Sequence, residues 1–247
     1  MNTSPSSSEW SCDPFLDGRL TICQSRRGYR FSIDALILAQ HAVPGGHRER
    51  ILDLGTGCGI MPLVIAWRFP EVQITGVEIQ PELAAQARHN VTQNGYQARI
   101  TILEEDYLQL PAAAVGPPVD MVVANPPYRR PRSGRINPRH QRALARHEIA
   151  VSLDGLVKAM RRFLKTGGRG WMIYTVDRLV EVLAALTAHH LEPKYVRLIH
   201  SRRDAPAKLC LIKVVKGANP GLFAGPPLVV YREDGGHTEE VAAMLRP

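Results

Sequence analysis

Short apolar runs alternate along this chain with segments whose apolar residues recur at helical spacing. The apolar runs begin near Arg50 and continue at residues 73–79, 99–103 and 119–124. Between them, helical spacing predicts helices over 60–67 and 81–94. Strands and helices in alternation indicate a parallel sheet with right-handed crossovers, and ligands of such sheets bind outside the carboxyl ends of the strands.

The C-terminal half continues the alternation and then changes it. Helix 152–164, strand 169–175 and helix 177–190 are followed by two apolar strands, 194–200 and 208–215, with only a polar segment between them. Strands joined in this way form an antiparallel pair. The pattern therefore predicts seven strands in one mostly parallel sheet, closed by an antiparallel hairpin.

The N-terminal segment has a different pattern. Residues 1–14 open with a Ser/Pro-rich stretch without periodicity, which predicts a disordered tail. A short β-hairpin is expected over 15–31, with its basic turn at 25–28, followed by a helix over 32–41. This small hairpin-and-helix unit precedes the predicted sheet.

The length and composition favour one domain. A chain of 247 residues with 45% hydrophobic content buries one sizeable core. We therefore expect a single domain over 15–247, divided into the N-terminal unit (15–45), a catalytic core (46–217) and a C-terminal extension (218–247).

A glycine-rich turn follows the first strand of the predicted sheet. After Asp53, glycine recurs at every second position, as Gly55, Gly57 and Gly59. Glycine permits sharp backbone bends and lets a ligand approach main-chain atoms closely. A dinucleotide-binding fingerprint places its third glycine three residues after the second, where this chain has Ile60. The spacing therefore weakens a dinucleotide-binding interpretation.

Acidic residues follow the next strands. Glu78 ends the second strand, where a carboxylate can accept hydrogen bonds from both ribose hydroxyls of a nucleoside. This order resembles class I S-adenosylmethionine-dependent methyltransferases, which have a Rossmann-like α/β fold. Asp106, after the third strand, is then expected to accept from the cofactor's adenine amine, or else to cap a helix. Asp53 is expected to meet the cofactor's ammonium, or else to fix the turn's own amides.

The most specific motif follows the fourth strand as Asn125-Pro126-Pro127-Tyr128. The two prolines lock the backbone, so the Asn125 side chain and the Pro126 carbonyl are held rigidly. These two acceptors can accept hydrogen bonds from both N–H groups of a planar amine and turn its delocalised lone pair towards an electrophile. Tyr128 can stack on the planar group and orient it. The motif therefore predicts methylation of a conjugated amine by direct in-line displacement.

The charge indicates a polyanionic partner. The formal net charge is +8, and one arginine-rich segment follows the Asn-Pro-Pro-Tyr motif directly. We expect its arginines to contact RNA phosphates beside a pocket for the target base, helped by arginines of two other turns. The expected RNA-binding residues are Arg129, Arg130, Arg132, Arg135, Arg139, Arg26, Arg27, Arg202 and Arg203.

The cysteines and apolar runs suggest where the protein works. Cys12, Cys23, Cys58 and Cys210 lie far apart, with no Cys-x-x-Cys motif and no Cys/His pair at zinc spacing. We therefore expect no metal site. No apolar run approaches the ~20 residues that span a bilayer, so a cytoplasmic location with reduced thiols is expected.

Further segments narrow the resemblance. The order of the glycine-rich turn, the acid and Asn-Pro-Pro-Tyr is similar to methyltransferases that act on adenine N6, guanine N2 or glutamine N5. Residues 28–36, 145–148 and 197–208 look like the bacterial tRNA1(Val) adenine-N6 methyltransferase family, which modifies the adenosine 3′ of the valine anticodon. The resemblance implies S-adenosylmethionine as cofactor and tRNA as partner. It also implies that Phe31 and Asp34 lie near the cofactor's methionine end.

Other functions fit parts of the same pattern. Glutamine N5-methylation of a peptide release factor, guanine-N2 methylation of ribosomal RNA and adenine methylation of DNA require the same amine clamp. Release-factor methyltransferases usually carry a helical domain before the glycine-rich turn, and only about fifty residues precede it here. A non-enzymatic alternative is an RNA-binding protein built on a silent methyltransferase frame, which the intact Asn125, Glu78 and glycines oppose.

Overall fold

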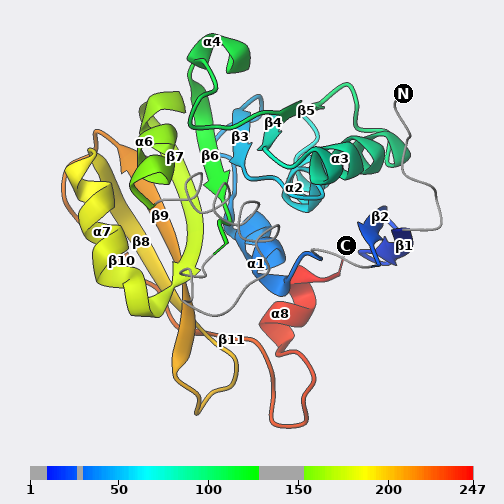
Figure 1. The fold of residues 1–247 in the computed structure, drawn as a ribbon. Coiled ribbons are helices and arrows are strands. Elements are labelled where there is room, and N and C mark those ends of the chain that lie inside the picture. The colour runs from blue at the N-terminus through cyan, green and yellow to red at the C-terminus, as the bar shows by residue number, and fades with distance from the viewer. Residues whose placement is uncertain (1–9, 27–29, 128–152, 247) are drawn as a thin grey trace, which may run out of the picture.

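The computed structural model describes residues 10–26, 30–127 and 153–246. Its centre is a mixed sheet in the order β8-β9-β7-β6-β3-β4-β5 (Figure 1). These strands are β3 (Arg50–Leu54), β4 (Gln73–Glu78), β5 (Ile100–Glu104), β6 (Val119–Ala124), β7 (Leu164–Thr175), β8 (Leu191–His200) and β9 (Ala207–Lys216). Only β9 runs antiparallel to its neighbours in this set, β7 and β8. The predicted mostly parallel sheet with its closing hairpin is confirmed.

Two very short strands extend the sheet beyond the seven predicted. β10 (Phe223–Ala224) and β11 (Leu228–Val229) both pair with β8, which gives nine strands in the described sheet. Each has only two residues. A pair of residues cannot produce a periodic pattern, so the sequence did not indicate them.

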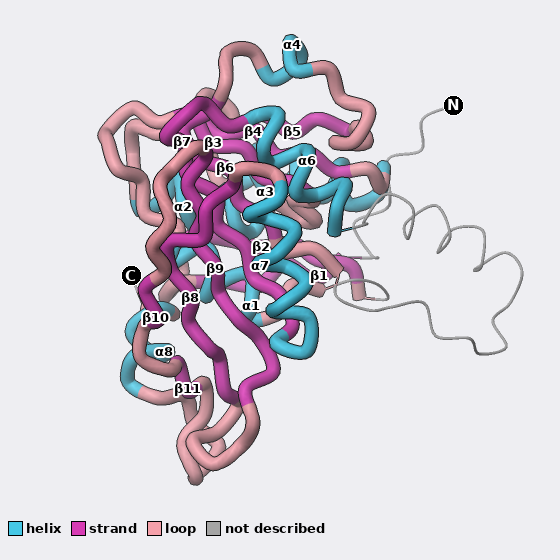
Figure 2. The backbone as a smooth tube through the Cα atoms, turned by 90° about the vertical axis from the view of Figure 1, so that its left-hand side faces the viewer, coloured by secondary structure: helices cyan, strands magenta, loops and turns pink. Residues whose placement is uncertain are grey.

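Helices cover both faces of the sheet. α1 (Ile33–His41), α2 (Ile60–Arg68) and α3 (Pro81–Gln93) pack on one face, whereas α6 (Leu153–Phe163) and α7 (Leu179–Ala188) pack on the other. Figure 2 shows α6 and α7 together on one side of the strands. Successive residues of β6 alternate between the two cores: Met121 and Val123 join the first, Val122 and Ala124 the second.

The described residues also form three short helical elements. They are α4 (Ala112–Val115), a single 3-10 turn (Val176–Arg178) that leads into α7, and α8 (Glu239–Met244). Among the described residues, no helix has the length and apolar character needed to cross a membrane.

The N-terminal hairpin lies earlier in the chain than predicted. β1 (Trp10–Phe15) pairs antiparallel with β2 (Leu20–Ser25), and the turn is made by residues 16–19. The predicted disordered tail is therefore wrong for residues 10–14, and the predicted basic turn at 25–28 lies after the hairpin. The sequence did not predict β1, because its residues 12–14 are exposed and show no apolar alternation.

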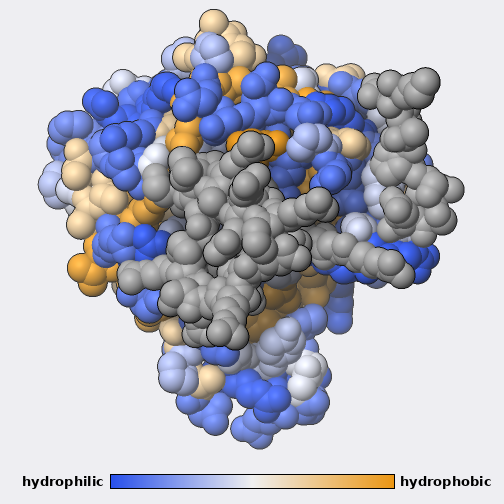
Figure 3. Space-filling model, in the orientation of Figure 1, coloured by the Kyte–Doolittle hydropathy of each residue, from blue (hydrophilic) through white to orange (hydrophobic). Residues whose placement is uncertain are grey.

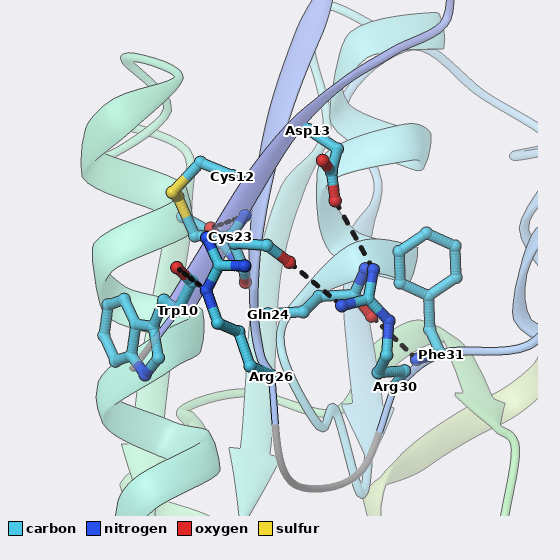
Figure 4. Close-up of polar contacts among 10 residues, drawn as sticks. Trp10, Cys12, Asp13, Cys23, Gln24, Arg26, Arg30 and Phe31 are labelled. Atoms are coloured by element: carbon cyan, nitrogen blue, oxygen red, sulfur yellow. Dashed lines mark hydrogen bonds and ion pairs between the residues drawn. A yellow bond between two sulfur atoms is a disulfide. The ribbon is translucent and has the colours of Figure 1, made fainter. Parts of the chain in front are cut away.

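The hairpin carries a disulfide. Cys12 and Cys23 are opposite each other in the register of β1 and β2 and are bonded through their sulfur atoms (Figure 4). The expectation of reduced thiols is therefore wrong for this pair. Cys58 and Cys210 are free and buried.

Two asparagines of α3 dock the hairpin on the domain. The Asn90 side chain accepts from Cys23 N and donates to Cys23 O, at 2.8 and 2.9 Å. One turn later, the Asn94 side chain makes the same two contacts with Thr21 N and Thr21 O, at 2.8 Å each. The amide side chains thus replace a neighbouring strand along the edge of β2.

The C-terminal extension closes on α1 and β8 through a buried arginine. Arg197 of β8 is 6% exposed, and its guanidinium donates to both carboxylate oxygens of Glu240 in α8, at 2.6 and 2.8 Å. Gln40 of α1 donates to Met244 O at 2.6 Å. These contacts fix the last helix beside the first.

Candidate active site

The carboxyl ends of three neighbouring strands bring the predicted site together. In the register of the sheet, Leu54 at the end of β3 lies beside both Val77 of β4 and Ala124 of β6. Glu78, the glycine-rich turn and Asn125 come immediately after these positions. They therefore meet at one edge of the sheet, as the sequence predicted.

The turn after β3 needs its glycines for two different reasons. Gly55, Gly57 and Gly59 have φ of 79°, 58° and 81°, in the left-handed region that side chains disfavour. A Cβ on Gly55 would meet nothing within 4 Å, so this position borders open space. A Cβ on Gly59 would lie 3.2 Å from the Ala87 Cβ, so Gly59 also permits close packing of α3.

Glu78 is held in place by backbone amides. The side chain is almost fully buried, and its Oε2 accepts from Gly57 N at 2.9 Å while Oε1 accepts from Gln80 N at 2.9 Å. Gly55 N and Thr56 N both donate to Val77 O. The carboxylate therefore ties the end of β4 to the glycine-rich turn and is itself oriented for a ligand.

Asp53 is a buried acid with unused acceptors. The residue is 0% exposed, and neither carboxylate oxygen makes a hydrogen bond of normal geometry with a described residue. Burial raises the pKa of Asp53 to about 7; the Glu78 carboxylate adds to this rise, and the Thr56 hydroxyl opposes it. A cationic ligand group would supply the missing partner, so this observation fits the ammonium of S-adenosylmethionine.

Asp106 caps the turn that follows β5. Its Oδ1 accepts from Leu108 N at 2.8 Å, and its main-chain oxygen accepts from Gln109 N and Leu110 N. This is the capping role that the sequence left open. The predicted hydrogen bond between the Asp106 carboxylate and the cofactor's adenine amine stays a prediction. The capping role is compatible with it, because the carboxylate lies at this edge of the sheet.

A small pocket joins the glycine-rich turn to the Asn-Pro-Pro motif. Gly55 and the half-buried Asn125 line it from the ends of the neighbouring strands β3 and β6. The other lining residues are Thr56 and Cys58 of the turn, Ala35 of α1, and Ile60 and Met61 of α2. Sequence reasoning did not select Ala35, Thr56 or Met61. Thr56 and Met61 lie in and just after the glycine-rich turn but carry no distinctive chemistry, and Ala35 joins them because α1 packs on α2.

Phe31 and Asp34 lie at the entrance to α1. The Phe31 ring packs on Phe15 of the hairpin, 5.9 Å between centroids, and its amide donates to Gln24 Oε1 (Figure 4). Burial raises the pKa of Asp34, against the opposing Ser32 hydroxyl and its own amide. The adjacent Ala35 lines the pocket, whereas neither Phe31 nor Asp34 is among its lining residues.

Most of the predicted RNA-binding arginines lie outside the described residues. These are Arg27, Arg129, Arg130, Arg132, Arg135 and Arg139, and Tyr128 of the motif lies outside as well. Arg26 is exposed and donates to Trp10 O at 3.2 Å. Arg202 and Arg203 are exposed in the turn between β8 and β9, at the lower end of Figure 1. The described surface in Figure 3 is mostly hydrophilic.

A second cavity is lined by basic side chains near the ends of α6, α7 and β9. Lys158, Arg161, Arg162, His189 and Lys216 surround it. Lys216 Nζ donates to the main-chain oxygens of Arg161 and Leu164, and Arg162 Nη1 donates to Leu108 O. Lys216 and Arg162 thus satisfy main-chain carbonyls, and Lys158 and His189 both contact the Asp154 carboxylate, so these side chains have structural roles.

Comparison with known proteins decides the family. The family described as Methyltransferase small domain matches residues 31–180. A tRNA1(Val) (adenine(37)-N6)-methyltransferase of Porphyromonas gingivalis is 32% identical, over 95% of this chain and 94% of its own length. The chain belongs to the tRNA1(Val) (adenine(37)-N6)-methyltransferase family. It is therefore a methyltransferase.

Other comparisons agree with this assignment. The Shewanella loihica member of the tRNA1(Val) (adenine(37)-N6)-methyltransferase family is 30% identical over 94% of this chain and 97% of its own length. The crystal structure of a predicted O-methyltransferase from Agrobacterium tumefaciens superposes with a TM-score of 0.68 and 24% identity, over 85% of this chain and 94% of that one. The latter match shows the fold alone.

Proposed function

We propose that this protein transfers a methyl group from S-adenosylmethionine to the N6 amine of an adenosine in tRNA, next to the valine anticodon. One observation carries the proposal: Asn125, at the start of the Asn-Pro-Pro segment, and the glycine-rich turn line the same pocket. The relatives that cover nearly the whole chain carry the name of this activity. We also propose that the hairpin, core and C-terminal extension act as one domain.

The geometry of the site supports the following assignment of cofactor-binding residues. Glu78 would hold the ribose hydroxyls, the turn at 55–59 would contact the cofactor through main-chain atoms, and Asp53 would pair with the ammonium. Asp106 would accept from the adenine amine. When bound, S-adenosylmethionine supplies an electrophilic methyl group on a sulfonium. Gly55, with open space where a side chain would stand, leaves room for a ligand to approach.

The amine clamp prepares the nucleophile. The N6 lone pair of adenine is delocalised into the ring, so the free amine is a poor nucleophile. The Asn125 side-chain oxygen and the Pro126 carbonyl would each accept a hydrogen bond from one N–H of the amine, which localises the lone pair on nitrogen. The prolines hold both acceptors in one geometry, and Tyr128 would stack on the base. These groups orient the amine for in-line attack and take no part in covalent chemistry.

The RNA contacts would come from arginine-rich segments that precede and follow the pocket residues in the sequence. The segment 129–139 follows the clamp directly, and Arg26 and Arg27 precede α1. Arginine pairs with phosphates independently of sequence, so these residues would position tRNA while the clamp selects the amine. A tRNA substrate also agrees with the expected cytoplasmic location.

The proposal is tested by giving the protein three classes of substrate. Labelled S-adenosylmethionine is supplied with unmodified valine tRNA, with ribosomal RNA and with a peptide release factor, and the products are digested to single nucleosides or amino acids. We expect N6-methyladenosine from the tRNA alone. Transfer to release-factor glutamine or to guanine N2 would keep the amine clamp and overturn the substrate. Cofactor binding without transfer to any of the three would overturn the activity.

A further inference from the structure

Three potential metal ligands meet where the N-terminal hairpin contacts α3. Cys12 and Cys23 face each other across β1 and β2, and His89 stands opposite them on α3. One ligand atom from each of the three lies within 4.8 Å of the other two. Figure 4 shows the two sulfur atoms on the side of the hairpin that faces the helix. No residue of this cluster belongs to the cofactor pocket.

The environment of the cluster suits a bound ion. Cys12 and His89 are exposed, so a metal or a reductant can reach them, whereas Cys23 is buried. The Trp10 ring packs against the His89 imidazole at 5.0 Å between centroids, in an edge-on arrangement, and limits the ring's freedom. Two thiolates and an imidazole are the ligand types of zinc sites, and zinc accepts a water as a fourth ligand.

We propose that Cys12, Cys23 and His89 form a zinc site when the two cysteines are reduced, and that the disulfide is its oxidised, metal-free state. A dithiol reductant supplies two electrons and two protons: the Cys12–Cys23 bond breaks, two thiols form, and the reductant becomes a disulfide. Zn²⁺ then displaces the two thiol protons and binds both thiolates and one ring nitrogen of His89. This inference does not depend on the proposed substrate.

The two states connect different elements. The disulfide joins β1 only to β2, but the zinc would join both strands to α3. Asn90, the residue after His89, bonds the Cys23 main chain and also donates to Cys58 O in the glycine-rich turn, at 2.9 Å. The zinc would therefore strengthen the contact between the hairpin and α3, which already supports the glycine-rich turn through Asn90. It would do so under the reducing conditions that break the disulfide.

Metal titration of the full chain tests the proposal. The protein is reduced with a phosphine, which leaves no competing thiol, and titrated without oxygen with Zn²⁺ by calorimetry and with Co²⁺ by absorption. We expect one ion per chain, thiolate-to-cobalt charge-transfer bands, and no binding to the oxidised protein. His89→Gln should weaken binding at least about tenfold, since even supporting contacts at zinc sites contribute that much. Cys12→Ser should abolish the binding.

Cys210→Ser is the matched control, because it removes a free, buried thiol on β9 and leaves the cluster intact. It should bind as the wild type does. Cys12 and His89 are exposed, so their replacement should leave the fold intact, and circular dichroism of each variant checks this. The proposal is overturned if the reduced wild type binds no zinc, if His89→Gln binds equally well, or if Cys210→Ser weakens binding as much as Cys12→Ser.

Discussion

At the scale of single residues, Asp53 and Glu78 show how one edge of a sheet gives two carboxylates different roles. Glu78 accepts two backbone amides and is oriented by them. Asp53 is completely buried, and in the part of the chain that the structure describes neither of its carboxylate oxygens makes a hydrogen bond of normal geometry. Burying an unpaired charge is costly, so the free protein keeps Asp53 protonated up to about neutral pH. A cationic ligand would reverse this.

Replacing Asp53 with asparagine should change the pH dependence of stability. The folded pKa of about 7 exceeds the ordinary 3.8, so between these values the folded state holds a proton that the unfolded state has lost. The free energy of unfolding of the wild type therefore falls as pH rises from about 4 to about 7. Asp53→Asn should flatten this slope and make the free protein more stable than the wild type at pH ~8.

The measurement is urea unfolding of both proteins at several pH values, with cofactor affinity by calorimetry at pH ~8. We expect Asp53→Asn to bind S-adenosylmethionine at least about tenfold more weakly, since a charged pair contributes about 1.5–3 kcal/mol. Equal slopes in wild type and variant would show that Asp53 is ionised in the free protein. Equal cofactor affinity would remove it from the binding site.

The sequence predicts part of this site because that part is local. The glycines, Glu78 and Asn125 stand next to strand ends, so their spacing places them at one edge before any packing is known. Ala35 could not be found, because its place in the pocket depends on how α1 packs on α2. Thr56 and Met61 lie next to the glycines, but their side chains carry no chemistry that marks them as pocket residues. The lack of partners around Asp53 is likewise a property of three-dimensional packing.

At the scale of elements, Asn90 of α3 links the hairpin to the cofactor turn. It is 0% exposed, and its side chain bonds Cys23 N, Cys23 O and Cys58 O. Asn90→Ala should lower the free energy of unfolding by about 3 kcal/mol, because three bonds are lost and buried groups are left unpaired. It should also weaken S-adenosylmethionine binding, because Cys58 lies in the turn.

Asn94→Ala is the control for this prediction. Asn94 is half-buried and bonds Thr21 but not the glycine-rich turn, so its loss should cost about 1 kcal/mol and leave cofactor affinity unchanged. Urea unfolding and calorimetric titration measure both quantities. Equal effects of the two variants on cofactor affinity would disprove a specific link through Asn90.

A second link between elements is the ion pair that holds α8. Hydrogen bonds from Arg197 lower the pKa of Glu240, so the pair stabilises the fold above the ordinary value of 4.5 and the contribution is lost as pH falls through the folded pKa. Glu240→Gln should lower the free energy of unfolding by about 1–2 kcal/mol at neutral pH and by less at pH ~4. The expected loss is smaller than for a fully buried ion pair, because the Glu240 side chain is half-exposed.

Thermal unfolding of the wild type and of Glu240→Gln, at neutral pH and at pH ~4, measures how the contribution of the ion pair depends on pH. Glu239→Gln, one residue earlier in the same helix, serves as the control, because its carboxylate makes no ion pair with a described residue. A Glu240→Gln cost that stays constant with pH would mean that the ion pair contributes nothing beyond packing.

At the scale of the whole molecule, the alternation of strands and helices predicts the central sheet, since each strand contributes alternate residues to two cores. Elements outside this alternation are poorly predicted. β1 has no apolar periodicity, and β10 and β11 are too short for one. The disulfide depends on the register of β1 with β2, and the predicted hairpin lies on other residues than the observed one. The Cys12–Cys23–His89 cluster joins segments far apart in the sequence, so no local pattern indicates it.

The net charge of +8 carries a prediction about tRNA binding. If Arg132 and Arg135 contact phosphates, replacing both with alanine should raise the KM for tRNA and lower the magnitude of the salt slope of log K by about 1.5. The Kd for S-adenosylmethionine should not change. Lys158→Ala with Arg161→Ala, which remove two charges from the cavity at the end of α6, should leave the slope unchanged. Equal slopes for both double variants would contradict a specific role for the segment.

The measurement that tests the central claim most directly uses two valine tRNA transcripts, with adenosine or guanosine immediately 3′ of the anticodon. Each is treated with the wild type and with Asn125→Ala, and the methylated nucleoside is identified by mass spectrometry. We predict N6-methyladenosine only from the wild type with the adenosine transcript. Asn125→Ala should keep cofactor binding and lose at least about 100-fold in kcat. Undiminished transfer by Asn125→Ala, or transfer to the guanosine transcript, would contradict the account.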